Sequence, residues 1–383
     1  MLKNALHCFA GVLICLGLLA PVLVQPVEAQ TWYVSPDGDD GNPGTAREPW
    51  KTPAMAARQA RPGDTVTIGG GIYPAMLEIT RSGAPGAIIV FQGSPDNPPV
   101  IDAAGRRHGV ILWNASHVCI RGLVVRNSLR NGIHLHDHLD AEDHGADYNV
   151  IEGNTIQNCG LDGYSGIYVG GHHNRIEGNR ILENGRNRTG TGEDGHGVYI
   201  LGNDNEVRAN QVSGNARVGI RMEGDRNRIE RNRLLENGDF GLSVWVDPPL
   251  TCSDTIISGN DFENNLRGGI SLYGQGQGGK PQRIHIAGNR LHHVTADCGI
   301  RLMAGVRQVR INLNRIIGRY EDGFLIVEKG AASGYSETNN LFCGKGAFVY
   351  LDREYSSFSQ YRAASGQGKG SRRIMSEQPA DCQ

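Results

Sequence analysis

Residues 174–185 read Asn-Arg-Ile-Glu-Gly-Asn-Arg-Ile-Leu-Glu-Asn-Gly, and this stretch decides the fold. It contains two three-residue segments, 175–177 and 180–182, each with an apolar Ile at its centre. Alternating polar and apolar residues are typical of β-strands that bury one face, and Gly and Asn are typical of the turns between strands. The pattern returns at 227–238 and in part at 258–262. It therefore predicts short strands joined by tight turns and repeated along the chain.

A second phrase lies between the copies of the first: a Gly, an apolar residue, a residue expected to face outward, and another apolar residue. Its nine copies begin at Gly132, Gly166, Gly197, Gly219, Gly241, Gly269, Gly299, Gly323 and Gly346. They are 22 to 34 residues apart, which is the spacing of solenoid repeats. Each unit has room for three short strands. The sequence therefore predicts an all-β, single-stranded parallel β-helix of about ten or eleven rungs, a rung being one full turn of the helix.

Asparagine recurs once per unit, at 154, 179, 210, 232, 260, 289, 314 and 339. Two explanations are open at this point. Asn tolerates the left-handed backbone of tight turns. Asn side chains that stack on successive strands also form ladders of hydrogen bonds.

Composition excludes several classes of protein. Gly supplies 54 of the 383 residues, and Gly weakens helix interiors, so a mostly helical fold is excluded. The formal net charge is −2 and no block of basic residues occurs, which argues against a nucleic-acid partner. Beyond the N-terminal leader no apolar run reaches about 18 residues, so we expect no membrane span. We expect the chain to be a monomer.

Residues 1–29 have the pattern of a secretory signal peptide: Lys3, an apolar run over 9–24, and small residues before Ala29. We therefore expect a secreted protein, extracellular or periplasmic, that is cleaved near Ala29. Residues 30–350 are expected to form the β-helix, with a short helix within 49–60 capping its open end. Residues 351–383 are expected to form a C-terminal cap or a tail.

Six cysteines remain after the predicted cleavage: Cys119, Cys159, Cys252, Cys298, Cys343 and Cys382. An even number in a secreted chain permits disulfides, but the sequence does not choose among the pairings. Some of the six are alternatively buried free thiols, which pack as small hydrophobic side chains. A C-terminal cap is expected to be held by Cys382.

The N-terminal part carries a resemblance to a known group of proteins. Residues 32–45 read Trp-Tyr-Val-Ser-Pro-Asp-Gly-Asp-Asp-Gly-Asn-Pro-Gly-Thr, followed by Pro-Trp-Lys-Thr at 49–52, Arg-Pro-Gly-Asp-Thr-Val at 61–66 and Gly-Gly-Ile-Tyr at 70–73. This succession resembles the N-terminal cap of secreted right-handed β-helix proteins, as in polysaccharide lyases of the pectate lyase and chondroitinase/alginate lyase type. The later repeats resemble the same superfamily down to about residue 350. The resemblance implies action on acidic carbohydrate polymers, although a shared fold does not fix the reaction. Our leading interpretation is an enzyme that cleaves an acidic polysaccharide by β-elimination or epimerises it.

Two columns of outward side chains are expected to form one surface strip. The residues two after each Gly are His134, Tyr168, Tyr199, Arg221, Ser243, Ser271 and Arg301, and those four after it are His136, Gly170, Leu201, Glu223, Trp245, Tyr273 and Met303. Aromatic rings stack on sugar rings, and Arg pairs with carboxylates. The strip therefore indicates a sugar-binding groove. Alternatively, the aromatic side chains only stabilise the sheet by pairing across strands.

A lyase or epimerase acting on uronates must neutralise the sugar carboxylate and move the proton on C5. Arg221 is the expected carboxylate partner. The expected proton-transfer residues are Tyr199 or Tyr168 with His196, and His134 is a further candidate. Trp245, Tyr273, Arg301, Glu223 and His136 are expected to bind the substrate. The mature chain's lysines lie off the strip, which departs from pectate-type lyases that use a Lys base; these are Lys51, Lys280, Lys329, Lys345 and Lys369.

The stretch 134–147 is the most unusual in the chain. It carries three alternate histidines, His134, His136 and His138, and then the acidic residues Asp140, Glu142, Asp143 and Asp147. Three alternatives are open here: a polar loop over the groove, a Ca²⁺ site built from the carboxylates, or a transition-metal site built from the histidines.

Two other functions remain open beside the lyase or epimerase. A glycoside hydrolase on the same fold would need two carboxylates in the groove, for which Glu223, Asp239 and Asp247 are candidates. A non-catalytic carbohydrate-binding surface protein would need the aromatic side chains but no acid/base pair.

Overall fold

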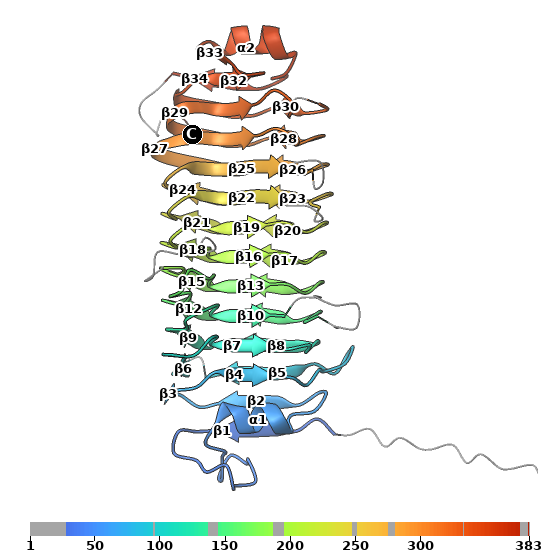
Figure 1. The fold of residues 1–383 in the computed structure, drawn as a ribbon, viewed down its shortest axis with the longest axis vertical. Helices are drawn as coiled ribbons and strands as arrows, with labels where there is room; N and C mark the ends of the chain where they lie inside the picture. Colours follow the sequence, from blue (N-terminus) through green and yellow to red (C-terminus); the bar gives the residue numbers. More distant parts are fainter. Residues whose placement is uncertain are drawn as a thin grey trace, which may run out of the picture.

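The computed structural model describes residues 28–94, 96–136, 145–186, 195–246, 251–274, 280–331, 333–375 and 382. They form an all-β parallel solenoid of about ten rungs with two short helices, which confirms the predicted β-helix. Figure 1 shows the rungs stacked into an upright column, with helix α1 at the N-terminal end and helix α2 at the other. Residues 1–27 of the predicted signal peptide lie outside the described residues. Neither helix in the described part of the chain is long and apolar enough to cross a membrane.

Each rung contributes strands to three long faces. Face A is a twelve-stranded parallel sheet: β1 (Thr31–Val34), β2 (Thr65–Ile68), β5 (Ile89–Gly93), β8 (Val118–Arg121), β11 (Val150–Glu152), β14 (Arg175–Glu177), β17 (Glu206–Arg208), β20 (Arg228–Glu230), β23 (Ile256–Ser258), β26 (His285–Ala287), β28 (Arg310–Asn312) and β30 (Ser336–Thr338).

Face B, which carries the predicted strip, contains β4 (Leu77–Ile79), β7 (Val110–Leu112), β10 (Ile133–Leu135), β13 (Ile167–Val169), β16 (Val198–Ile200), β19 (Ile220–Met222), β22 (Phe240–Val246), β25 (Gly268–Gly274) and β32 (Phe348–Tyr350). Strand β33 (Arg353–Tyr355) adds to β32 in the antiparallel direction.

Face C contains β3 (Ile72–Tyr73), β6 (Val100–Asp102), β9 (Val124–Arg126), β12 (Thr155–Gln157), β15 (Arg180–Leu182), β18 (Gln211–Ser213), β21 (Arg233–Leu235), β24 (Asp261–Glu263), β31 (Leu341–Lys345) and β34 (Arg372–Ile374). Two long strands, β27 (Arg290–Leu302) and β29 (Arg315–Val327), run around the corner and belong to faces B and C alike.

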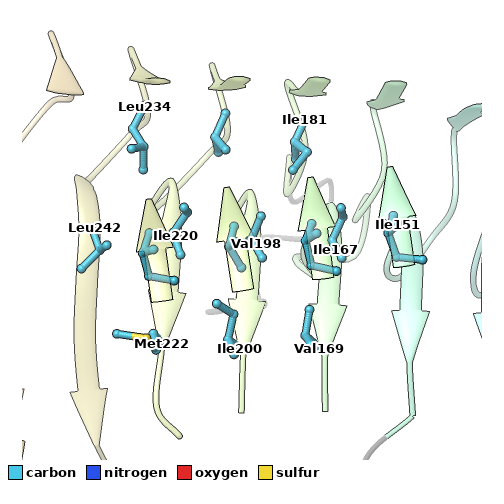
Figure 2. Packing of buried hydrophobic residues seen from close by; sticks show 14 of the residues in the cluster. Ile151, Ile167, Val169, Ile181, Val198, Ile200, Ile220, Met222, Leu234 and Leu242 are labelled. Carbon is cyan, nitrogen blue, oxygen red and sulfur yellow. The ribbon is translucent and has the colours of Figure 1, made fainter. Parts of the chain in front are cut away.

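The core is a set of apolar rows that run along the solenoid axis. The central residue of nearly every face A and face C strand is fully buried, as are both end residues of the three-residue face B strands from β4 to β19. Figure 2 shows one such row, Ile167, Val198 and Ile220, beside a second formed by Val169, Ile200 and Met222. Period-two alternation thus places one apolar side chain above the next, so the rungs share one continuous core.

Asparagine ladders occupy the corners of the solenoid, and this explains all of the repeated Asn except Asn339. The Oδ1 atom of Asn210 accepts hydrogen bonds from the backbone N–H of Asn179 at 2.8 Å and from its side-chain amide at 3.0 Å. Its own Nδ2 donates to the carbonyl of Ile176 at 2.8 Å. The left-handed residue is the one before, Ala209, with φ of 54°. The buried ladder therefore satisfies backbone groups that the turn leaves unpaired.

This ladder runs through Asn154, Asn179, Asn210, Asn232, Asn260, Asn289, Asn314 and Asn340. Shorter ladders occupy the other two corners, one through Asn149, Asn174, Asn205 and Asn227 and one through Asn184, Asn215, Asn237 and Asn265. Asn339, the last of the recurring asparagines, does not join this ladder. Asn339 takes the left-handed turn position, with φ of 54°, and its neighbour Asn340 enters the ladder.

Both ends of the solenoid are covered. Helix α1 (Pro53–Gln59) lies within the predicted 49–60, and its first turn is capped by the Thr52 hydroxyl, which accepts from the backbone N–H of Met55 at 3.2 Å. Helix α2 (Phe358–Ser365) packs Tyr361 against Phe348 of the last face B strand, with ring centroids 4.9 Å apart.

One disulfide, Cys343–Cys382, ties the C-terminal end of the chain to strand β31. The other four cysteines among the described residues are buried free thiols: Cys119, Cys159, Cys252 and Cys298. Both explanations offered for the cysteines therefore apply, each to part of the set. The domain limits at 30 and 350 stay predictions.

The register of the last two copies of the Gly phrase differs from the prediction by one residue. Ile300 lies opposite Leu325, and Arg301 lies opposite Ile326. The residue that continues the outward column is therefore Ile326, three after Gly323 rather than two. The shift follows irregular pairing of β27 with β29 at the corner, between His293 and Cys298.

Candidate active site

One unbroken row of side chains runs along the outside of face B. Direct partners in register on consecutive strands are Glu78, Ile111, His134, Tyr168, Tyr199, Arg221, Ser243, Ser271 and Arg301. The structure thus places all seven residues of the first predicted column in one row. The first two members of the row, Glu78 and Ile111, were not predicted, although Gly109-Val110-Ile111-Leu112 is a further copy of the Gly phrase.

Two hollows lie along this row and meet at Tyr199. The first, of about 880 Å³, lies over β7, β10 and β13 and is lined by His108, Trp113, His134 and Tyr168 among others. The second, of about 600 Å³, lies over β16 to β27 and is lined by residues that include Arg221, Trp245 and Tyr273. Tyr199 lines both hollows. Together they form a groove along the solenoid axis, which we call the face B groove.

Tyr199 stands in a small polar cluster. Its hydroxyl donates a hydrogen bond of 2.5 Å to Oε1 of Glu223, and Nη2 of Arg221 lies 3.3 Å from the same oxygen. The Arg221 guanidinium lies 5.0 Å from the centre of the Tyr199 ring and 5.8 Å from that of Trp245. Glu223, expected to bind substrate, is only 2% exposed. It is therefore placed to orient Tyr199 and Arg221 from beneath the groove.

His196 packs beside Tyr199, with ring centroids 5.6 Å apart. It is 2% exposed, and neither ring nitrogen has a hydrogen-bond partner among the described residues. Burial, with smaller contributions from the cations of Arg221 and Arg217, lowers the pKa of His196 to about 3. The imidazole is therefore neutral at pH 7. Because both nitrogens are buried, the structure brings the ring to Tyr199 without presenting a nitrogen to the groove.

His134 is a neutral hydrogen-bond donor. The Oδ1 atom of Asn131 accepts from the backbone N–H of Ser165 at 2.9 Å, which leaves its Nδ2 to donate to Nδ1 of His134 at 2.9 Å. The proton of His134 must then sit on Nε2. Burial, followed by the charges of neighbouring His and Arg side chains, lowers the pKa of His134 to about 2. With its lone pair occupied, His134 can offer an N–H but has no free base.

Aromatic side chains continue on both sides of Tyr199. The rings of His134 and Tyr168 are nearly parallel, at 4° and 4.7 Å, and the edge of Tyr168 meets Tyr199 at 5.7 Å. On the other side, Trp245 is 37% exposed and lies 4.3 Å from Tyr273 between ring centroids. These rings supply apolar walls for a sugar chain.

Two predicted substrate-binding residues have partners within the protein. Arg301 pairs with Glu328, with an N–O distance of 2.8 Å. His136 is 3% exposed and packs its ring against Trp113 at 4.0 Å. His136 thus supports an exposed Trp that the sequence analysis did not single out.

The predicted metal site falls mostly on 137–144, which lie outside the described residues. These include Asp140, Glu142 and Asp143. Asp147 is described, and its Oδ1 accepts a hydrogen bond from the backbone N–H of His172 at 2.7 Å. No group of three or more His, Cys, Asp or Glu side chains suited to a metal occurs in the described part of the chain. Calcium binding therefore stays a prediction.

Sequence comparisons place the chain among β-helix proteins. The family described as "Pel9A-like, right handed beta helix region" matches residues 32–159, and the family described as "Right handed beta helix region" matches 108–277 and 196–360. The chain is 26% identical over 260 residues to pectate lyase PEL9 of Emericella nidulans, covering 63% of this chain. It spans 60% of the length of that relative.

Solved structures share the architecture. Pectate lyase Pel9A superposes with a TM-score of 0.56 and 14% identity, covering 81% of this chain and 78% of that one. An alginate lyase from Paenibacillus sp. str. FPU-7 superposes with a TM-score of 0.54 and 17% identity, covering 84% and 99% respectively. At these identities the likeness shows the fold alone. Since the second family match alone extends over 108–360, the chain belongs to the right-handed β-helix family, as its N-terminal motifs predicted.

Proposed function

We propose that this chain is a secreted polysaccharide lyase that cleaves a uronate-containing polymer by β-elimination in the face B groove. The observation that carries the proposal is the cluster of Tyr199, Glu223 and Arg221 at the point where the two hollows meet. It joins a proton-transfer group, a proton acceptor behind it and a cation, which are the parts that elimination next to a carboxylate requires.

In the proposed reaction the guanidinium of Arg221 faces the uronate carboxylate and stabilises the negative charge that develops on it. The oxygen of Tyr199 takes the proton from C5 while its own proton passes to Glu223, 2.5 Å away. The electrons of the C5–H bond form the C4–C5 double bond, and the C4–O4 bond breaks. The proton on Glu223 then returns through Tyr199 to the departing O4 oxygen, so the residues end as they began.

A C5-epimerase would share the first step of this reaction. It would differ in returning a proton to the opposite side of C5, which needs a second acid across the sugar ring. The relatives that match the chain include proteins named as pectate and alginate lyases, which supports elimination. No step is assigned to calcium.

The hydrolase alternative needs two carboxylates facing the sugar. In the second hollow Asp239 is the one acidic residue among the described lining residues, and it lies 3.9 Å from Arg267. Glu223 lies beneath the floor, and Asp247 is outside the described residues. The described lining of the second hollow therefore supports elimination better than hydrolysis.

The test is to incubate the purified protein with polygalacturonate, alginate and glycosaminoglycans. A lyase creates a double bond conjugated with the carboxylate, which absorbs ultraviolet light. New reducing ends without this absorbance would instead indicate a hydrolase. Altered C5 stereochemistry by NMR without chain cleavage would indicate an epimerase. Binding without any change in the polymer would indicate a carbohydrate-binding protein.

A further inference from the structure

The first hollow of the groove contains a cationic group that the elimination centre does not use. Arg106, Arg107 and Arg130 all line it. None of the three has a carboxylate partner among the described residues, and the one acidic residue described in the lining is the exposed Glu78. Several Arg side chains elsewhere do pair with carboxylates at close range, as Arg226 does with Asp204 at 2.7 Å. The hollow thus keeps positive charge available to a ligand.

The cations face an otherwise neutral lining. Burial, together with the charges of Arg107 and Arg130, lowers the pKa of His108 to about 4. Burial, followed by the charges of neighbouring His side chains and of the same two arginines, lowers the pKa of His134 to about 2. Both imidazoles are therefore uncharged at pH 7. Arg107 and Arg130 line the same hollow as these two imidazoles. Arg130 is held with its guanidinium 4.9 Å from the centre of the Tyr164 ring.

An exposed indole completes the hollow. Trp113 lies four residues after Gly109, just as Trp245 lies four residues after Gly241, so the two indoles hold equivalent places in the repeat. Trp113 is 47% exposed. The ring of His136 packs against Trp113 in a T-shaped arrangement. Trp113 lies three strands before Tyr199 and Trp245 lies two strands after it, so about five strand spacings of roughly 4.8 Å separate the two indoles. Tyr199 therefore lies between two aromatic platforms.

We infer that the first hollow is a binding subsite for an anionic sugar residue that is not itself transformed. Trp113 stacks on its ring, and Arg107 and Arg130 bind its carboxylate through charge-assisted hydrogen bonds. The inference rests on the proposed function in that the residue belongs to the same chain that is cleaved at Tyr199. Its consequence is substrate selection: the enzyme requires acidic residues several sugars away from the cleaved bond, and so prefers continuous blocks of uronate.

The test measures binding of each protein to polygalacturonate and alginate by affinity electrophoresis, with dextran sulfate and neutral dextran as comparison polymers. The variants are Arg107→Gln, Arg130→Gln and Trp113→Ala. The matched controls are Arg231→Gln and Tyr148→Ala, which alter an exposed Arg and an exposed aromatic residue outside both hollows. Each groove variant should weaken binding to a uronate polymer about tenfold, the loss expected for one charged or stacking contact. For cleavage, KM should rise while kcat stays near that of wild type.

The outcomes separate the inference from the proposed function. If the wild-type protein cleaves a uronate polymer and the Arg variants bind it as well as the controls do, the subsite is wrong and the lyase stands. If the variants lose uronate binding but no protein forms a double bond, the subsite stands and the lyase is wrong. Equal loss of dextran sulfate binding would show a general attraction to anions and overturn the carboxylate assignment.

Discussion

The hydroxyl of Tyr199 donates a 2.5 Å hydrogen bond to the buried carboxylate of Glu223, one rung away along face B. The register that sets Tyr199 opposite Arg221 also brings the guanidinium over the Tyr199 ring. This short hydrogen bond to a buried acceptor fixes the orientation of the phenol before any substrate arrives. The position of the Tyr199 hydroxyl oxygen in the groove is therefore set by Glu223, a buried residue that the substrate does not contact.

Removing that oxygen should abolish most of the activity without disturbing the fold. Tyr199→Phe keeps the ring that packs on Arg221 and His196 and loses only the hydroxyl. Loss of a general acid/base group costs about 10² to 10⁴ in rate. We expect kcat to fall by that factor on the polymer that the wild-type protein cleaves. The variant should keep the circular dichroism spectrum of the wild type.

The control for this substitution is Tyr148→Phe, which removes a hydroxyl from an exposed ring outside both hollows. It should leave kcat unchanged. Full turnover by Tyr199→Phe would place the chemistry elsewhere in the groove.

A charged side chain should not be tolerated in the inward-facing row of face B. Ile220 is fully buried between Val198 and Leu242 on the neighbouring strands. Ile220→Asp would bury an unpaired carboxylate, so we expect an insoluble or unfolded product. Ile220→Val should lower the free energy of unfolding by only about 0.5 to 1.5 kcal/mol. Urea titration measures the stability of both Ile220 variants. The control is Gln211→Asp, which places the same charge at a half-exposed outward position.

The fold could be predicted from the sequence because one physical rule is repeated along the chain. Every repeat buries side chains at the same positions. The apolar residues therefore recur at a regular spacing, which can be recognised in the sequence without knowing which strands lie next to each other. The rule fails where consecutive residues are chemically alike. Asn339 and Asn340 are identical in kind, and only the register of the last rungs decides which one is buried.

The site could be predicted only in part for a related reason. Positions inside strands, such as Tyr199 and Arg221, follow the alternation and lie where expected. Positions just beyond the strands do not, because the chain is free to turn the side chain inward or outward there. Glu223 and His136, just beyond three-residue strands, are buried. Trp245 holds the equivalent place in the repeat but lies within the longer strand β22, and it is exposed. The arginines of the first hollow come from loops with no periodic pattern.

Breaking the longest Asn ladder should destabilise the solenoid. Asn210 accepts two hydrogen bonds from Asn179 and donates to the Ile176 carbonyl, all in a buried corner. Asn210→Ala leaves these groups unpaired, at a cost of about 1 to 3 kcal/mol for each buried group. We expect a clear fall in Tm by calorimetry. Gln211→Ala, at the half-exposed next position, should change Tm little, and equal effects of the two would contradict a stabilising ladder.

Calcium binding by the loop can be tested on the protein as purified. If Asp140, Glu142 and Asp143 hold Ca²⁺, a chelator should lower Tm and activity, and added Ca²⁺ should restore both. Asp140→Asn with Asp143→Asn should remove the response. If elemental analysis finds no metal and the chelator has no effect, calcium binding is wrong and the alternative of a polar loop over the groove is retained.

Buried neutral histidines should make the fold sensitive to acid, and His293 tests this away from the groove. It is fully buried on β27, and burial lowers its pKa to about 3. In the unfolded chain an imidazole takes up a proton below about pH 6.5. Protonation therefore favours the unfolded state as the pH falls from 7 toward 4, whereas above pH 6.5 the stabilisation is fully present. At pH 5 the loss amounts to about 2 kcal/mol for this one side chain.

Urea unfolding of the wild type and of His293→Asn at pH 7.5 and pH 5 measures that difference. The variant should be less stable than the wild type at pH 7.5, because the hydrogen bond of His293 to the Tyr320 hydroxyl is lost. The gap between the two proteins should narrow by about 2 kcal/mol at pH 5, because only the wild type has an imidazole there to protonate on unfolding. His292→Asn, a substitution at the half-exposed neighbouring position, controls for loss of an imidazole from this corner. A constant gap at both pH values would show that His293 is not held neutral by burial.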